Sequence, residues 1–307
     1  MEQHAHRHES VYRRITEQIA SAIAAGAPRY EMPWHHSGPA CARPVNVLTN
    51  KPYQGINVLA LWVAAQSRGF ASGIWATYRQ WKTLGAQVRK GEKGSTIVFY
   101  KKLEGAPQDE AQPDDKPETR LVARASVVFN AAQVDNWAAP EPAGERNPVA
   151  AIEAAECFVR SIGADIHEGG EIACYRPYAD YIQMPPRSVF RGTSTNTPTE
   201  SYYAVLFHEL THWTGHTSRL NRDFSGRFGN EAYAMEELVA ELGAAYLCAD
   251  HSVSNSPRPD HAAYVAGWLR ALNNDPRAIF TAAGKASAAA AYLAEKAQAS
   301  RSSPGSS

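Results

Sequence analysis

The segment His208 to His212 constrains the fold of this chain more than any other feature, because it carries an HExxH pattern inside an apolar stretch. Residues four apart lie one turn apart on the same face of an α-helix. The imidazoles of His208 and His212 then reach one metal ion, and Glu209 beside them is placed to take a proton from metal-bound water. Unpaired imidazoles would be costly in such apolar surroundings. The segment that starts near Pro198 therefore predicts a metal-binding helix.

A third protein ligand is expected, since a catalytic zinc usually takes three and leaves one position for water. The metzincin pattern HExxHxxGxxH fails here, because its last position is Ser218. His216 would reach the metal only if the helix continued past Gly215, and ligands at i, i+4 and i+8 drift around a helix. A third ligand from the same segment is therefore disfavoured.

A second helix, predicted over residues 231–248, offers carboxylates instead. Glu237 and Glu241 share one face, so the first is placed to ligate zinc while the second accepts a hydrogen bond from a ligand histidine. The surrounding residues are largely apolar, which argues against a solvated face. We predict Glu237 as the third ligand and Glu236 as its reserve.

The chemistry predicted from these residues is metal-assisted hydrolysis of a peptide bond, with Glu209 as the catalytic base. Zn²⁺ is the expected metal, and Mn²⁺ or Co²⁺ also fits such ligands. Either His216 or Tyr233 is near enough in sequence to stabilise an oxyanion, and the choice stays open. The strand predicted over 178–184 is a place where an extended peptide adds to a sheet.

The charge distribution divides the chain. Residues 1–103 hold 14 lysines and arginines against 5 acids, whereas the whole chain is neutral, with 31 of each. The same basic third carries four of the seven tryptophans. Cations interleaved with aromatic rings favour nucleic acid, because cations meet phosphates and rings stack on unpaired bases.

The basic, glycine-punctuated turn at 87–94 is the centre of this prediction, since its amides and cations are suited to phosphates. Tyr78 is a further candidate for stacking. The residues predicted to contact DNA are Trp34, Arg43, Lys51, Tyr53, Trp75, Trp81, Arg89, Lys90, Lys93, Lys101 and Lys102.

Apolar periodicity and turn residues predict the remaining elements. Helices are expected over 11–25, 56–67, 77–84, 149–162, from 198, 231–248, 260–272 and 276–299; strands are expected over 96–100, 121–129, 165–167 and 178–184. The strands at 96–100 and 121–129 are predicted to pair antiparallel. The acidic, proline-containing stretch at 104–119 is predicted to be a disordered insert, and the proline-rich stretch at 140–148 is predicted to be a linker.

Composition excludes several classes of protein. No run approaches the ~20 apolar residues that a membrane span needs, and the first 25 residues lack the apolar core of a signal peptide. The four cysteines contain no CxxC pair, which argues against a disulfide framework. We therefore expect a cytoplasmic protein with no membrane partner.

Four segments together resemble the ArdC-type antirestriction proteins of conjugative plasmids: GINVL at 55–59, QVRKGEKG at 87–94, HELTHWTGH at 208–216 and AMEELVAELGAAYL at 234–247. The resemblance runs from about residue 10 to 295. It implies an α+β fold of two domains, in which a single-stranded-DNA-binding domain precedes a mostly helical, zincin-like metallopeptidase domain. Combined with the composition, it places the domains at 1–139 and 149–307. It also implies His208, His212 and Glu237 as metal ligands and Glu209 as the catalytic glutamate.

The function expected from the resemblance is protection of incoming plasmid DNA from host restriction. Single-stranded DNA is the expected partner, duplex DNA binds more weakly, and the protein or peptide substrate is unidentified. Two alternatives stay open. In the first, the chain is an intracellular zinc peptidase, with or without dependence on DNA, and its basic domain recruits the substrate. In the second, it is a DNA-binding module whose metal site is structural or vestigial. Whether protection needs proteolysis is also open.

Overall fold

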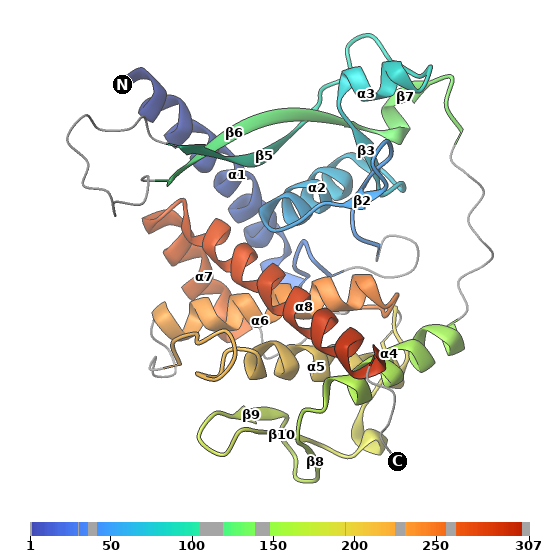
Figure 1. Cartoon of the computed structure of the whole chain (residues 1–307), viewed down its shortest axis with the longest axis vertical. Helices are drawn as coiled ribbons and strands as arrows, with labels where there is room; N and C mark the ends of the chain where they lie inside the picture. The colour runs from blue at the N-terminus through green and yellow to red at the C-terminus, as the bar shows by residue number, and fades with distance from the viewer. Residues whose placement is uncertain are drawn as a thin grey trace.

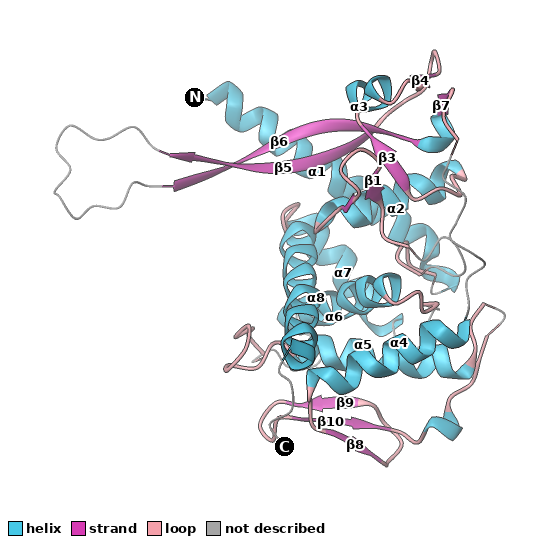
Figure 2. Ribbon diagram, turned by 45° about the vertical axis from the view of Figure 1, so that its right-hand side comes forward, coloured by secondary structure: helices cyan, strands magenta, loops and turns pink. Residues whose placement is uncertain are grey.

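The computed structural model describes residues 2–29, 31–35, 42–104, 119–138, 148–193, 195–224, 231–255 and 262–302. The chain is an α+β protein of two parts. A five-stranded sheet lies at one end of the molecule and a three-stranded sheet at the other, with most of the helices between them (Figures 1 and 2).

The N-terminal part combines two long helices with the larger sheet. Helix α1 (Glu2–Gly26) and helix α2 (Ile56–Arg68) lie beneath strands in the order β2-β1-β3-β6-β5. The strands are β1 (Val45–Asn46), β2 (Lys51–Pro52), β3 (Ile74–Ala76), β5 (Ser95–Glu104) and β6 (Thr119–Asn130). The last two pair antiparallel, as predicted. Asn57 covers the outer edge of β5, because its side-chain amide bonds both the N–H and the C=O of Val98 at 2.8 Å.

A small lobe stands beside this sheet. It consists of α3 (Tyr78–Thr83) and the two-stranded pair of β4 (Gln87–Val88) with β7 (Val134–Asp135). Trp81 is fully buried at its centre, and its indole nitrogen donates to the carbonyl of Phe129 at 3.0 Å. The basic turn described above at residues 87–94 leads from β4 to β5 and belongs to this lobe.

The C-terminal part is mostly helical. Its elements are α4 (Pro148–Ile162), β8 (Ile166–Glu168), β9 (Cys174–Arg176), β10 (Tyr181–Met184), α5 (Pro198–Trp213), α6 (Glu231–Asp250), α7 (Ala262–Asn274) and α8 (Ala278–Ser302). The strands form a sheet in the order β8-β10-β9, against which α5 packs. None of the helices in the described ranges is both long and apolar enough to cross a membrane.

Every predicted helix is present, and the strands that prediction missed are all two or three residues long. Strands β1, β2, β3, β4, β7 and β9 belong to that group. Such segments are too short for an alternating pattern to emerge, and neighbouring strands define them instead. The predicted disordered insert and the predicted linker fall outside the described residues, apart from the positions at their ends.

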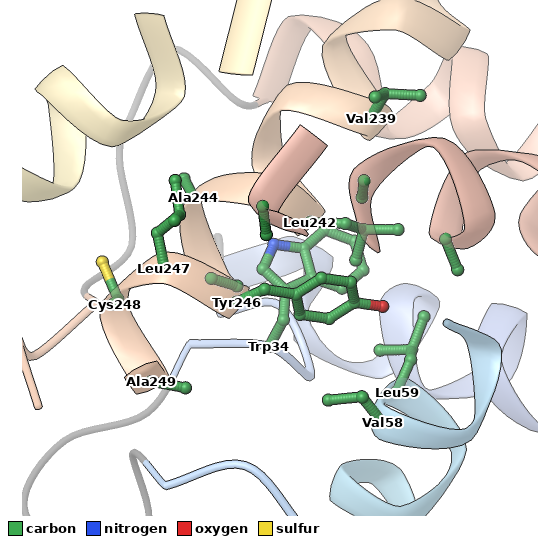
Figure 3. Close-up of a cluster of buried hydrophobic side chains, with 14 of the residues drawn as sticks. Trp34, Val58, Leu59, Val239, Leu242, Ala244, Tyr246, Leu247, Cys248 and Ala249 are labelled. Carbon is green, nitrogen blue, oxygen red and sulfur yellow. The ribbon is translucent and has the colours of Figure 1, made fainter. Parts of the chain in front are cut away.

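One cluster of buried apolar side chains runs through both parts. Figure 3 shows Trp34, Val58 and Leu59 of the N-terminal part beside Leu242 and Tyr246 of α6. Burying these large side chains removes apolar surface of both parts from water at once. The two parts therefore share a core.

Polar contacts join the same surfaces. The N–H of Gly55, just before α2, donates to the hydroxyl of Ser287 in α8 at 2.8 Å, and its C=O accepts from Tyr246 at 3.0 Å. Gly55 has φ 56°, a conformation that favours glycine. The guanidinium of Arg43 lies 2.7 Å from the Asp250 carboxylate and 4.8 Å from the centre of the Tyr246 ring. The start of α2 is thus fastened to α6 and α8.

Candidate metal centre

Local sequence explains where α5 begins. Thr197 is its N-cap: the hydroxyl accepts from the N–H of Glu200, and the Glu200 carboxylate accepts from the N–H of Thr197. Pro198 occupies the first turn, where its missing N–H costs nothing. This capping box fixes the register of the helix and puts the HELTH sequence in its last two turns, buried against α6.

Three side chains from these two helices meet at one point. The Nε2 atoms of His208 and His212 lie 3.1 Å apart, and the Glu237 carboxylate lies 3.4 Å from the first and 3.6 Å from the second. Ligands held at 2.0–2.1 Å around a tetrahedral Zn²⁺ are about 3.3 Å from one another. Two imidazoles and a carboxylate are also a donor set that zinc accepts. The three residues therefore fit a divalent metal without rearrangement.

A different carboxylate stands behind each imidazole. Glu241 lies 2.7 Å from Nδ1 of His208, and Glu236 lies 3.1 Å from Nδ1 of His212. Such contacts fix the ring orientation and leave Nε2 free for a metal. Glu236 was predicted as the reserve ligand, but its carboxylate contacts Nδ1 of His212, not the Nε2 atom that faces the proposed metal position. It is therefore not one of the three candidate ligands that come together.

Arg222 completes the surroundings of Glu236. Its Nε and Nη2 both donate to this carboxylate at 3.0 Å, and it also donates to the carbonyl of Thr211 at 2.6 Å. Burial by itself would raise the pKa of Glu236, but hydrogen bonds and charge from His212 and Arg222 lower it overall. Glu236 is therefore an anion that is already paired. No sequence pattern marked Arg222, which comes from the loop after α5.

Glu209 points into a cavity of about 420 Å³ beside the candidate ligands. One of its carboxylate oxygens accepts a hydrogen bond from the N–H of Tyr175 in β9 at 2.8 Å. The cavity wall includes Cys174, Tyr175, Phe224, Tyr233 and Tyr264. Of the two candidate oxyanion stabilisers, Tyr233 lines this cavity. His216 does not, and its Nδ1 atom pairs instead with Ser218.

The edge strand beside the cavity is not the one predicted. Strand β10 was expected to accept an extended peptide, but it lies between β8 and β9 and pairs with both. Strand β9 forms the outer edge and lines the cavity. Prediction missed β9 because it has only three residues. The turn from Pro177 to Asp180 ends β9. Asp180 has a φ of 54°, and the chain reverses there into β10.

Several residues predicted to bind DNA are buried, which corrects that prediction. Trp34, Trp75 and Trp81 are at most 1% exposed. Trp34 packs against Trp268 with ring centroids 5.8 Å apart, and Trp75 packs against Phe70 at 6.0 Å. Rings inside the core have no face for a base, so we withdraw these three tryptophans from the DNA-binding set.

Arg43 and Tyr53 leave the set for a similar reason. Arg43 is 7% exposed and is held by Asp250, and Tyr53 is 8% exposed with its hydroxyl accepting from Asn46 at 3.2 Å. A sequence shows that a cation is present but not the acid that neutralises it. Here that acid comes from α6, about 200 residues further along the chain.

Within the basic turn, Arg89 is held by other residues, whereas the side chains of Lys90 and Lys93 are exposed. Arg89 pairs with Glu92 at 2.9 Å and donates to the carbonyl of Ala132, so it ties the turn to the lobe around β7. Lys51, Lys90 and Lys93 are exposed. Lys101 and Lys102 lie in β5, but their side chains fall outside the described set.

A shallow hollow lies next to this turn and is lined by Tyr78, Gln87, Arg89, Lys90 and Phe129. Tyr78 is 46% exposed, and its hydroxyl accepts from the side-chain amide of Gln87 at 3.3 Å. It is thus an exposed aromatic ring beside Lys90, in a hollow that Glu92 and Asp135 also line.

Comparison with known proteins agrees with this division of the molecule. Residues 9–129 match the model of the N-terminal domain of the anti-restriction factor ArdC, and residues 153–285 match that of a zincin-like metallopeptidase. An uncharacterized protein, y4eC of Sinorhizobium fredii, is 50% identical over 290 residues, covering 92% of this chain and 91% of its own length. DNA primase TraC of Escherichia coli is 38% identical over 285 residues, but those residues span only 19% of TraC.

Two solved structures are similar over nearly the whole chain. Both are of the antirestriction ArdC protein from plasmid R388. The metal-free structure is 39% identical, with a TM-score of 0.75, and covers 94% of this chain and 98% of its own. The Mn(II)-bound structure is 40% identical, with a TM-score of 0.72, and covers 93% and 97%.

Proposed function

This chain belongs to the ArdC family of antirestriction proteins, and from that premise we propose that it binds single-stranded DNA through its N-terminal part and protects incoming plasmid DNA from host restriction. We further propose that the C-terminal part is a metal-dependent peptidase acting in the cytoplasm, where such DNA arrives. Residues 1–139 form the first domain, 140–148 the linker and 149–307 the second domain in this proposal. Duplex DNA is a weaker partner.

The observation that carries the peptidase half is the meeting of His208, His212 and Glu237 at spacings that suit a tetrahedral metal. We propose these three as the ligands, with Zn²⁺ as the resident metal. Mn²⁺ is supported by the Mn(II)-bound ArdC of plasmid R388, and Co²⁺ suits the same donors. When bound there, a divalent metal supplies Lewis acidity toward water and the peptide carbonyl.

The chain's own residues do the rest. Glu209 takes a proton from the attacking water and delivers it to the leaving amine. Its hydrogen bond from the N–H of Tyr175 holds one oxygen and leaves the other for this transfer. Because β9 is the outer edge of its sheet beside the cavity, we propose that an extended substrate segment lies along β9.

The DNA-binding half rests on the surface around the basic turn. We propose that Lys51, Lys90 and Lys93 contact phosphates and that a base stacks on Tyr78, and we keep Lys101 and Lys102 of β5 as further candidates for phosphate contacts. Phosphate contacts release counterions, so affinity should fall steeply as salt rises.

A salt titration of oligonucleotide binding tests this half. Replacing Lys90 and Lys93 together by glutamine should weaken binding to all single-stranded sequences about equally, because phosphate contacts carry no sequence information. The double variant should also flatten the salt dependence, since each lost phosphate contact lowers the slope by about 0.7 for single strands. The exposed pair Arg13 and Glu17 of α1, replaced by glutamine, serves as the control. No binding by the unmodified protein at low salt would refute the proposal.

The Glu209→Gln variant tests whether proteolysis takes part in protection. The amide cannot accept the proton, so any peptidase activity should be lost while metal and DNA still bind. Plasmid transfer into a restricting host then separates two mechanisms. Loss of protection in this variant points to hydrolysis, whereas full protection points to shielding by bound DNA-binding domains.

A further inference from the structure

The two helices that carry the candidate ligands touch where Thr211 of α5 meets Gly243 of α6. A β-carbon added at Gly243 would lie 2.4 Å from Cγ2, 2.5 Å from Oγ1 and 3.0 Å from Cβ of Thr211. Non-bonded carbon atoms in good contact are about 3.5–4.0 Å apart. No residue larger than glycine therefore fits at position 243 with α5 and α6 at their present separation.

Thr211 has little freedom to turn aside. It is fully buried, and its hydroxyl donates to the carbonyl of Phe207 at 2.8 Å. Its own carbonyl accepts from the guanidinium of Arg222 at 2.6 Å. A β-branched side chain also has few rotamers in a helix. A side chain at position 243 would therefore be accommodated by moving α6 away from α5.

This contact lies close to the proposed metal position on both helices. Thr211 stands between the two histidines of the HELTH sequence, one turn after His208. Gly243 comes two turns after Glu236 and Glu237 on α6. Because helices are stiff at this length, the separation of α5 and α6 at Thr211 also determines how near the Glu237 carboxylate comes to the imidazoles.

The metal site has little tolerance for a wider separation. The Glu237 carboxylate lies 3.4 and 3.6 Å from the two Nε2 atoms, close to the spacing of about 3.3 Å expected around a tetrahedral metal. Metal–ligand distances vary by only about 0.2 Å. Relieving the contact at position 243 requires a shift of about 1 Å, which is several times larger.

A second helical glycine shows that the close contact is particular to position 243. Glycine is a poor helix former, so its presence within a helix often has a packing reason. At Gly284 in α8, however, an added β-carbon would meet nothing within 4 Å. The two positions therefore differ in the space around them, although both lie inside long helices.

We propose that Gly243 is a positioning residue of the metal site: its missing side chain lets α6 approach Thr211 closely enough for Glu237 to meet the imidazoles of His208 and His212. This inference rests on the proposed metal site and concerns how that site is preorganised. The two helices then hold the three ligands at the spacing that a metal needs before it binds.

Metal binding by the whole protein tests the inference. The dissociation constant of Mn²⁺ is measured by competition with a chelator, and the visible absorption bands of the Co²⁺ complex report the geometry at the metal. Gly243→Ala should weaken Mn²⁺ binding roughly ten- to hundredfold, the scale for losing support of a ligand, and should shift the Co²⁺ bands. Gly284→Ala, the same substitution where the added methyl group has room, is the matched control and should change neither.

A rescue experiment separates crowding from a general loss of stability. Adding Thr211→Ala to Gly243→Ala removes the atoms that would lie at 2.4 and 2.5 Å and leaves only the contact at 3.0 Å. The double variant should therefore regain most of the Mn²⁺ affinity and the original Co²⁺ bands. If Gly243 served stability alone, Gly243→Ala would unfold at a lower temperature without metal, but its folded form would keep the Co²⁺ bands of the unmodified protein.

The outcomes distinguish this inference from the site on which it rests. If folded Gly243→Ala has unchanged affinity and Co²⁺ bands, or if Thr211→Ala restores neither, the positioning role is refuted while the metal site stands. If the unmodified protein binds no metal, or His208→Ala binds as tightly as it does, the proposed site itself is refuted. Should Gly243→Ala fail to fold, the double variant is compared with Thr211→Ala alone, and equal affinity and bands would refute the role.

Discussion

At the scale of single residues, the two histidines of the HELTH sequence are held by carboxylates of different character. Glu241 lies 2.7 Å from Nδ1 of His208. Glu236 contacts His212 and is also paired with the buried guanidinium of Arg222. Since Glu236 contacts both His212 and the guanidinium of Arg222, its charge matters to the fold as well as to the metal site.

We predict that Glu236→Gln lowers both stability and metal affinity. The amide keeps the shape of the side chain but leaves Arg222, whose side chain is 4% exposed, without a counter-charge. Losing that charge should cost about 2 kcal/mol of the free energy of unfolding. The weaker hold on His212 should also loosen Mn²⁺ binding about tenfold. Denaturant unfolding and metal titration measure the two effects.

Glu153→Gln, on the exposed face of α4, should change neither quantity. A Glu236→Gln protein with the stability and metal affinity of the unmodified chain would contradict the role given to the Arg222–Glu236 pair.

At the scale of elements, the site depends on how the β9–β10 hairpin is attached to the end of α5. Arg219, in the loop after α5, donates to the Asp180 carboxylate in the hairpin turn at 2.9 Å, and the hydroxyl of Tyr175 donates to the same group at 2.8 Å. The guanidinium also lies 3.8 Å from the centre of the Trp213 ring. These contacts keep β9, and the N–H that reaches Glu209, beside the HELTH sequence.

We predict that this attachment weakens in acid. The hydrogen bond from Arg219 holds the pKa of Asp180 below its usual value of 3.8. A folded-state pKa below the unfolded one means that the carboxylate stabilises the fold above pH 3.8 and loses this effect as the pH falls through the lower, folded value. Asp180→Asn should therefore cost about 1 kcal/mol at neutral pH, a modest value because the side chain is 37% exposed. The difference between the two proteins should vanish in acid.

Unfolding free energies of the two proteins between pH 2 and 7 check this prediction. Asparagine is the right replacement, because it tolerates the positive φ at this position. Glu171→Gln in the same sheet region is exposed and serves as the control. A difference that persists undiminished below the folded pKa would show that the charge of Asp180 is not what holds the hairpin.

At the scale of the whole molecule, the two family domains are not independent bodies. Trp34 of the N-terminal part packs on Trp268 of α7, and Tyr12 of α1 packs on Phe280 of α8 with centroids 4.6 Å apart. Tyr246 reaches back from the ligand-bearing helix α6 to Gly55. Because the core is common, we expect the protein to unfold as one cooperative unit.

Trp34→Ala tests this expectation. Removing a fully buried indole leaves a cavity and should cost about 3–5 kcal/mol. If the core is shared, thermal unfolding of the variant should still show one transition, shifted down for signals from both parts. Tyr78→Ala, on an exposed ring, should change stability by less than about 0.5 kcal/mol. Two separate transitions, with only the first one shifted, would contradict the shared core.

Prediction from sequence succeeded where local pattern is sufficient. Most long helices with apolar periodicity were located within a few residues, although α1 begins at Glu2 instead of residue 11. The antiparallel pairing of 96–100 with 121–129 is present. Prediction failed for short strands and for the exposure of aromatic residues. Three of the four tryptophans of the basic third were predicted to stack on bases, whereas all four are buried. Trp34, Trp62 and Trp75 belong to the core shared with the C-terminal part, and Trp81 belongs to the small lobe.

The amino-acid sequence by itself determined that the HELTH sequence lies in a helix, because helical spacing and capping are properties of neighbouring residues. Its motifs also identified the family and the two parts of the chain. Tertiary structure alone decided which carboxylate faces which imidazole, that Arg222 neutralises Glu236, and that β9 rather than β10 forms the edge at the cavity. These choices depend on contacts between segments far apart in the chain. The spacing of residues in the sequence does not reveal these contacts, because a buried charge needs a partner and that partner comes close only when the chain folds.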